Sequence, residues 1–129
     1  MEKNDARIRD RMAERAPDGV LPCAVAFALA EELGVSPAVI GEYADEMKIR
    51  LVKCQLGLFG YEPEKKIVKP RRPVPDELRS AVEKRLEGGR LACSQAFAAA
   101  AQLGVRKMDV SGACEAMEIK IKPCQLGAF

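Results

Sequence analysis

Apolar side chains recur at helical spacing in two stretches of the chain. Ile8 and Met12 stand four residues apart among charged residues, and Leu78 and Val82 stand four apart in a similar setting. This spacing places the apolar side chains on one face of a helix and the charged ones on the opposite face. Amphipathic first helices are therefore predicted over residues 5–16 and 75–87.

Two more helices are predicted after each first helix. Alanine-rich stretches end at Gly34 and Gly104, where glycine permits the left-handed conformation that closes a helix. Ser36 and the following Pro37 suit the start of another helix, because a hydroxyl can cap it and proline fits its first turn. The second helices are expected over residues 22–33 and 92–103, and the third helices follow at once.

Short strands are predicted after the third helices. Apolar and basic residues alternate along Ile49–Lys53 and Ile119–Lys122, which is typical of half-buried strands. A second strand would complete a wing, and Lys66–Lys69 could supply it in the first half. Only seven residues follow Lys122, so we expect the last strand to pair with Ile49–Lys53, or else with another subunit.

The two halves of the chain are copies of one unit. Residues 7–59 align with residues 77–129 without a gap, and 19 of the 53 positions are identical. A unit of about 60 residues folds alone only marginally, so we expect the two copies to pack together. Phe27 and Phe97, which match across the repeat, are expected in the core. We predict a first repeat (1–60), a basic proline-rich linker (61–75) and a second repeat (76–129).

The composition is that of a globular protein, with 48% hydrophobic and 31% charged residues. We find no apolar run long enough to span a membrane and no signal-peptide pattern, so we expect a cytoplasmic protein without a membrane partner. The net charge of +2 is unevenly divided, because residues 1–63 carry −3 and residues 64–129 carry +5. Only the second half is therefore suited to an anionic partner.

The segments Ala30–Tyr43 and Ala100–Ala113 resemble the helix-turn-helix signature of DNA-binding proteins. Each has a small residue where two helices cross, a glycine in the turn and apolar residues that seat the next helix. With the preceding helix and the following strand, each repeat resembles a winged helix-turn-helix. The Cys-Gln-Leu-Gly ending of each repeat is also similar to small ModE-like, molybdate-responsive regulators of anaerobes. The resemblance implies a mainly α fold with a short β-strand per repeat, in which two tandem three-helix units pack with pseudo-symmetry.

In such proteins the helix after the turn enters the major groove of DNA. That helix is acidic in the first repeat, whereas Arg106 and Lys107 begin it in the second, where cations oppose the helix dipole unless an anion lies nearby. We therefore expect duplex DNA to contact the second repeat and the linker. The alternative is that these cations are solvated surface charges. The candidate DNA-binding residues are Arg106, Lys107, Arg90, Lys120, Lys122, Lys65, Lys66, Lys69, Arg71 and Arg72.

Four of the five cysteines follow the repeat, as Cys23 with Cys54 and Cys93 with Cys124, while Cys114 has no counterpart. The chain has no His and no Cys-x-x-Cys, so we predict no metal site and no cofactor, and we interpret the cysteines as buried, reduced thiols. Redox sensing, or a four-thiolate site drawn from both halves, remains the alternative. Cys23 and Cys93 are the better candidates for reactivity, because they lie near helix N-termini.

The leading functional hypothesis is a DNA-binding protein that regulates transcription. A protein-interaction module built on the same fold is the main alternative, and a thiol or metal sensor is a further one. In any of these roles the protein could act as a homodimer. An enzyme is not expected, because no catalytic constellation and no phosphate-cradling glycine loop are present in the sequence.

Overall fold

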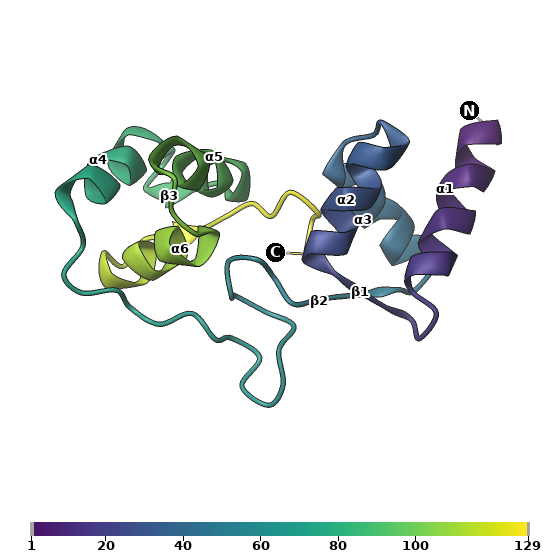
Figure 1. The fold of residues 1–129 in the computed structure, drawn as a ribbon, viewed down its shortest axis with the longest axis horizontal. Coiled ribbons are helices and arrows are strands. Elements are labelled where there is room, and N and C mark those ends of the chain that lie inside the picture. Colours follow the sequence, from purple (N-terminus) through teal and green to yellow (C-terminus); the bar gives the residue numbers. More distant parts are fainter. Residues whose placement is uncertain (1, 129) are drawn as a thin grey trace.

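The computed structural model describes residues 2–128, with side chains from residue 6 onward; Met1 and Phe129 lie outside the described residues. The helices form two lobes (Figure 1). The first lobe contains α1 (Glu2–Arg15), α2 (Cys23–Leu33) and α3 (Pro37–Glu46), and the second contains α4 (Asp76–Lys84), α5 (Cys93–Leu103) and α6 (Lys107–Ala116). The prediction of a mainly helical chain with short strands is confirmed.

The two lobes repeat one topology. Their elements follow in the same order, and the bounds of α5 and α6 are those of α2 and α3 moved by 70 residues. Gly34 and Gly104 close the second helices at φ angles of 68° and 65°, a left-handed conformation that suits glycine. The shared three-helix order predicted from the repeat is therefore confirmed.

Each lobe contains a pair of short parallel strands. In the first lobe β1 (Val20–Pro22) pairs with β2 (Arg50–Val52), and in the second β3 (Arg90–Leu91) pairs with β4 (Lys120–Ile121). The predicted pairing of the last strand with Ile49–Lys53 is wrong, because its partner lies directly before α5. Two helices carry the chain back to the starting edge, so the strands run parallel. With only two or three residues, β1 and β3 show no alternation that would have predicted them.

The predicted second strand of a wing is also wrong. Ile67 and Val68 donate their backbone N–H groups to a single acceptor, the Gly57 carbonyl, at 2.8 and 3.1 Å. They consequently form no ladder with β2. This stretch is part of an extended linker that runs from the first lobe to the second along α6.

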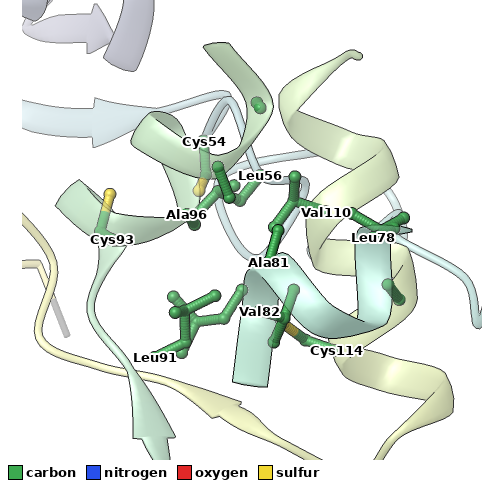
Figure 2. Packing of buried hydrophobic residues seen from close by; sticks show 14 residues of the cluster. Cys54, Leu56, Leu78, Ala81, Val82, Leu91, Cys93, Ala96, Val110 and Cys114 are labelled. Atoms are coloured by element: carbon green, nitrogen blue, oxygen red, sulfur yellow. The ribbon is translucent and has the colours of Figure 1, made fainter. Parts of the chain in front are cut away.

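The lobes exchange their Cys-Gln-Leu-Gly turns. The first turn (Cys54–Gly57) places Cys54 and Leu56 in the buried cluster of the second lobe, while Leu126 of the second turn (Cys124–Gly127) belongs to the cluster of the first lobe. Figure 1 shows the C-terminal segment crossing from one lobe to the other. Figure 2 shows Cys54 and Leu56 among the side chains of the second lobe. Each lobe therefore completes its core with a segment of the other.

The two exchanged turns make equivalent contacts with the third helices. Ser111 of α6 donates its hydroxyl to the Leu56 carbonyl at 2.6 Å. At the matching position in α3, a Cβ on Gly41 would lie 1.8 Å from the Leu126 carbonyl oxygen. One repeat therefore binds the incoming carbonyl with a hydroxyl, and the other makes room for it with a glycine.

Phe27 and Phe97 are half-buried, which corrects the expectation that they lie in the core. Their rings face each other across the lobes with centroids 5.1 Å apart. Phe27 and Phe97, which occupy the same position in the two repeats, therefore form an aromatic contact between α2 and α5.

Within residues 2–128, we find no single helix with the length and apolar character needed to cross a membrane. The helices α2 and α3 reach that length only together, as a pair bent by 113°.

We predict that Gly41→Ala destabilises the protein by about 1–3 kcal/mol, because the new methyl group collides with backbone and forces the second turn out of place. The better helix propensity of alanine offsets this by at most about 1 kcal/mol. Denaturant unfolding of the full chain measures the difference. The matched variant Ser111→Ala should lose about 1–3 kcal/mol through the unpaired Leu56 carbonyl. Wild-type stability in both variants would contradict the exchange.

Candidate nucleic-acid interface and thiol cluster

A basic groove lies at the strand end of the second lobe. Lys84 and Arg85 at the end of α4, Arg90 of β3 and Lys122 after β4 line an open cavity of about 1160 Å³, together with the single acid Glu87. At the matching places the first lobe has Glu14, Arg15, Val20 and Val52. The groove is therefore positive in one repeat only.

Arg85 shows how this difference arises. Its guanidinium donates to the side-chain carbonyls of Gln95 at 2.7 Å and Gln102 at 2.8 Å. In the first lobe the matching Arg15 forms an ion pair with Glu32 at 3.2 Å, and Glu32 also pairs with Arg11. Because Gln102 replaces that glutamate, Arg85 is held in place by neutral groups and its charge is not neutralised by them.

Arg90 has a further cation beside it on the small sheet. In the parallel register Arg90 lies opposite Lys120, whereas Val20 lies opposite Arg50 in the first lobe. Like charges on neighbouring strands repel and destabilise the pairing.

Arg106 is occupied by a neighbour on its own helix. It donates from Nε and Nη2 to Asp109 at 3.3 and 3.0 Å, and the same carboxylate accepts the Arg106 backbone N–H at 3.0 Å. The hydrogen bond from Arg106 lowers the pKa of Asp109. Arg71 also pairs with Asp109, at 3.0 Å. The anion expected near these cations is therefore Asp109, and the cation at the start of α6 needs no external partner.

Lys107 lies over an aromatic ring of its own lobe, with its ammonium 4.9 Å from the centre of the Phe97 ring, and it lines a pocket together with residues of the first lobe. The linker covers α6, because Arg71 donates its backbone N–H to the Gly112 carbonyl at 2.9 Å and a Cβ on Gly112 would lie 3.1 Å from the Lys69 carbonyl. Val110 to Cys114 are all buried. The helix expected to enter the major groove is consequently enclosed by the protein itself.

The remaining linker cations lie away from the basic groove. Lys66 forms an ion pair with Glu115 of α6. Lys65, Lys69 and Arg72 are exposed along the linker, and none of them lines the groove. From the predicted set, the structure therefore places Arg90 and Lys122 in the groove and Lys120 opposite Arg90 on the strand pair.

Sequence reasoning missed Lys84 and Arg85. The signal that could have found them is the exchange of Glu32 for Gln102 across the repeat, which removes an acid while keeping the arginine opposite it.

The four repeated cysteines lie at the junction of the lobes. Gln55 donates its amide to the Cys23 sulfur at 3.6 Å, and the matching Gln125 donates to the Cys93 sulfur at 3.4 Å. Electrostatic interactions link each of these two thiols to both Cys54 and Cys124. The turns thus bring together cysteines that are 31 residues apart in the sequence.

All five cysteines are free, and four of them are buried. Cys23 and Cys93 begin α2 and α5 as expected, but burial raises the pKa of Cys23, and it raises the pKa of Cys93 to about 11. The expectation that they are reactive is therefore wrong for the folded protein, because the loss of hydration outweighs the hydrogen bonds that Gln55 and Gln125 provide. Among the described residues, no three His, Cys, Asp or Glu side chains stand at metal-ligand spacing.

No family model, curated protein or solved structure matches this chain.

We predict that Cys93 makes the fold sensitive to alkali. Its pKa is raised from about 9 to about 11 by burial, so the stabilisation is complete below pH 9 and is lost as the pH rises to 11. By linkage the loss is on the order of 3 kcal/mol. Denaturant unfolding at pH 8 and pH 11 should show a smaller loss for Cys93→Ala than for the wild type. Equal losses in the two proteins would show that the Cys93 thiol is not shielded.

Proposed function

We propose that this protein binds duplex DNA through the basic groove of the second lobe and acts as a transcriptional regulator. The observation that carries the proposal is Arg85, which Gln95 and Gln102 hold in position without neutralising it, where the first lobe has an ion pair. Cations fixed in this way lose little side-chain freedom when they bind a phosphate.

The helix pairs support a helix-turn-helix scaffold for this function. In the first lobe α2 and α3 meet at 113° across a short turn that contains Gly34, and helix-turn-helix pairs cross at about 90–120°. The wing of the resemblance is not supported, since the two strands of each lobe pair in parallel with each other, one directly before the second helix and one after the third.

The proposed contact is with the DNA backbone. The linker covers α6, whereas Lys84, Arg85, Arg90 and Lys122 line an open groove, and long basic side chains at such a groove suit phosphates better than base edges. We therefore propose binding with little sequence preference from this lobe alone, and with a strong dependence on salt.

A second candidate function is binding to a basic protein. The observation that favours it is the exposed acidic face of α3, formed by Glu42, Asp45 and Glu46, which would repel phosphate. Loss of function in variants of this face, with DNA binding intact, would support it.

We predict that Gln102→Glu weakens DNA binding, because it restores the ion pair that neutralises the arginine of the first lobe. The slope of log K against log salt should fall by about 0.9 for one phosphate contact, and by about 1.8 in Arg90→Ala/Lys122→Ala. Titration of a fluorescent duplex at several salt concentrations measures both. The matched control Glu32→Gln, in the first lobe, should leave the slope unchanged or raise it.

Arg106→Ala is the control within the second lobe. Because Arg106 is engaged with Asp109, its removal should change the salt slope less than removal of Arg90. Absence of salt-dependent binding by the wild type, or a larger loss in Arg106→Ala than in the groove variants, would overturn the proposed interface.

A further inference from the structure

A second open cavity lies at the junction of the lobes, and its lining shares no residue with the basic groove. Its volume is about 510 Å³, within the range of roughly 300–1,000 Å³ that is typical of small-molecule sites. Residues of α2 and of the turn before α3 form most of its wall, and Phe97 and Lys107 of the second lobe complete it. Small-molecule sites occur preferentially at such junctions.

The wall of this junction cavity is mostly apolar. Phe27 and Phe97 contribute rings whose centres are 5.1 Å apart, and the exposed residues Ala24 and Ala28 of α2 line the cavity with them. Gln55 of the first exchanged turn is also in the wall, where its amide donates a hydrogen bond to a cysteine sulfur at 3.6 Å. Such a wall suits the apolar part of a small ligand.

Two side chains of opposite charge line the same cavity, Glu31 of α2 and Lys107 of α6. Among residues 6–128, neither of them forms an ion pair, with the other or with any neighbour. A cation and an anion that stand apart in one cavity leave room between them for a ligand that carries both charges.

Both charges also oppose the dipole of the helix that carries them. Lys107 is the first residue of α6, and Glu31 lies in the last turn of α2. A cation is unfavourable at a helix N-terminus, and an acid is unfavourable at a helix C-terminus. A ligand carboxylate at the start of α6 and a ligand ammonium at the end of α2 would compensate both. Residues that break a local rule in this way are expected at functional sites.

The internal repeat shows that the two charges are specific to this cavity. Ala101 occupies the position that matches Glu31, and Pro37 occupies the position that matches Lys107. The phenylalanine is kept in both repeats, as Phe27 and Phe97. The aromatic contact therefore belongs to the shared fold, whereas the charge pair is present once.

We propose that the junction cavity binds a small apolar α-amino acid in its zwitterionic form. The ligand carboxylate pairs with the Lys107 ammonium, and the ligand ammonium pairs with the Glu31 carboxylate. The apolar side chain of the ligand packs against the rings of Phe27 and Phe97. This binding goes beyond the proposed contact with DNA and does not depend on it.

The test is isothermal titration calorimetry of the full-length protein with L-phenylalanine and two analogues. We expect L-phenylalanine to saturate at about one ligand per chain. Hydrocinnamate lacks the ammonium and phenethylamine lacks the carboxylate, so each should bind about fivefold more weakly, or worse, through the loss of one charged contact.

Two variants test the assignment of each charge. Lys107→Met keeps the length of the side chain and should remove the preference for L-phenylalanine over phenethylamine. Glu31→Gln should remove the preference over hydrocinnamate. Ala28→Leu fills the cavity and should abolish binding, whereas the matched control Ala98→Leu, at a position outside the wall, should bind as the wild type does. Circular dichroism of each variant reports folding.

The wild type alone can refute the proposal, whatever the variants do. Absence of binding at millimolar L-phenylalanine, or equal affinities for the three ligands, would overturn it. Undiminished binding in a folded Ala28→Leu variant would place the ligand elsewhere and would overturn it as well.

Discussion

The exchange of the two Cys-Gln-Leu-Gly turns is the constraint on which the rest of the structure depends. Each turn brings a leucine into the core of the opposite lobe, and its backbone carbonyl meets the third helix there, at Ser111 in one case and at Gly41 in the other. Small units bury too little surface to be stable alone. By completing each core with the other repeat, the chain makes two marginal units into one folded body.

The exchange also determines which helix surfaces remain exposed to solvent. After the first turn enters the second lobe, the chain must travel along α6 before α4 can begin, and Lys69 to Arg71 consequently cover that helix. Arg106 and Lys107 make contacts within the protein, because Arg106 donates hydrogen bonds to Asp109 and Lys107 lies over the Phe97 ring. The cations that line the basic groove are instead those at the end of α4, in β3 and directly after β4. The same crossing gathers the four repeated cysteines between the lobes.

Local features of the fold followed from the sequence, and contacts between the repeats did not. Helical periodicity and the glycines at 34 and 104 predicted the helices, because those signals act over one or two turns of chain. The strands β1 and β3 are too short to produce a pattern. The Cys-Gln-Leu-Gly ending is present in both repeats, but the sequence of one repeat does not indicate which lobe its turn enters. The basic residues at β3 and β4 were predicted from their charge. Arg85 could be identified only from its contact with Gln102, which replaces the glutamate of the first repeat.

Through-space nuclear magnetic resonance contacts in the isotopically labelled full chain test the exchange most directly. The account predicts cross-peaks between Gly41 of α3 and Leu126, and between Ser111 of α6 and Leu56, in a monomeric sample. Cross-peaks that instead join Gly41 to Leu56 and Ser111 to Leu126 would place each turn in its own repeat and contradict the account.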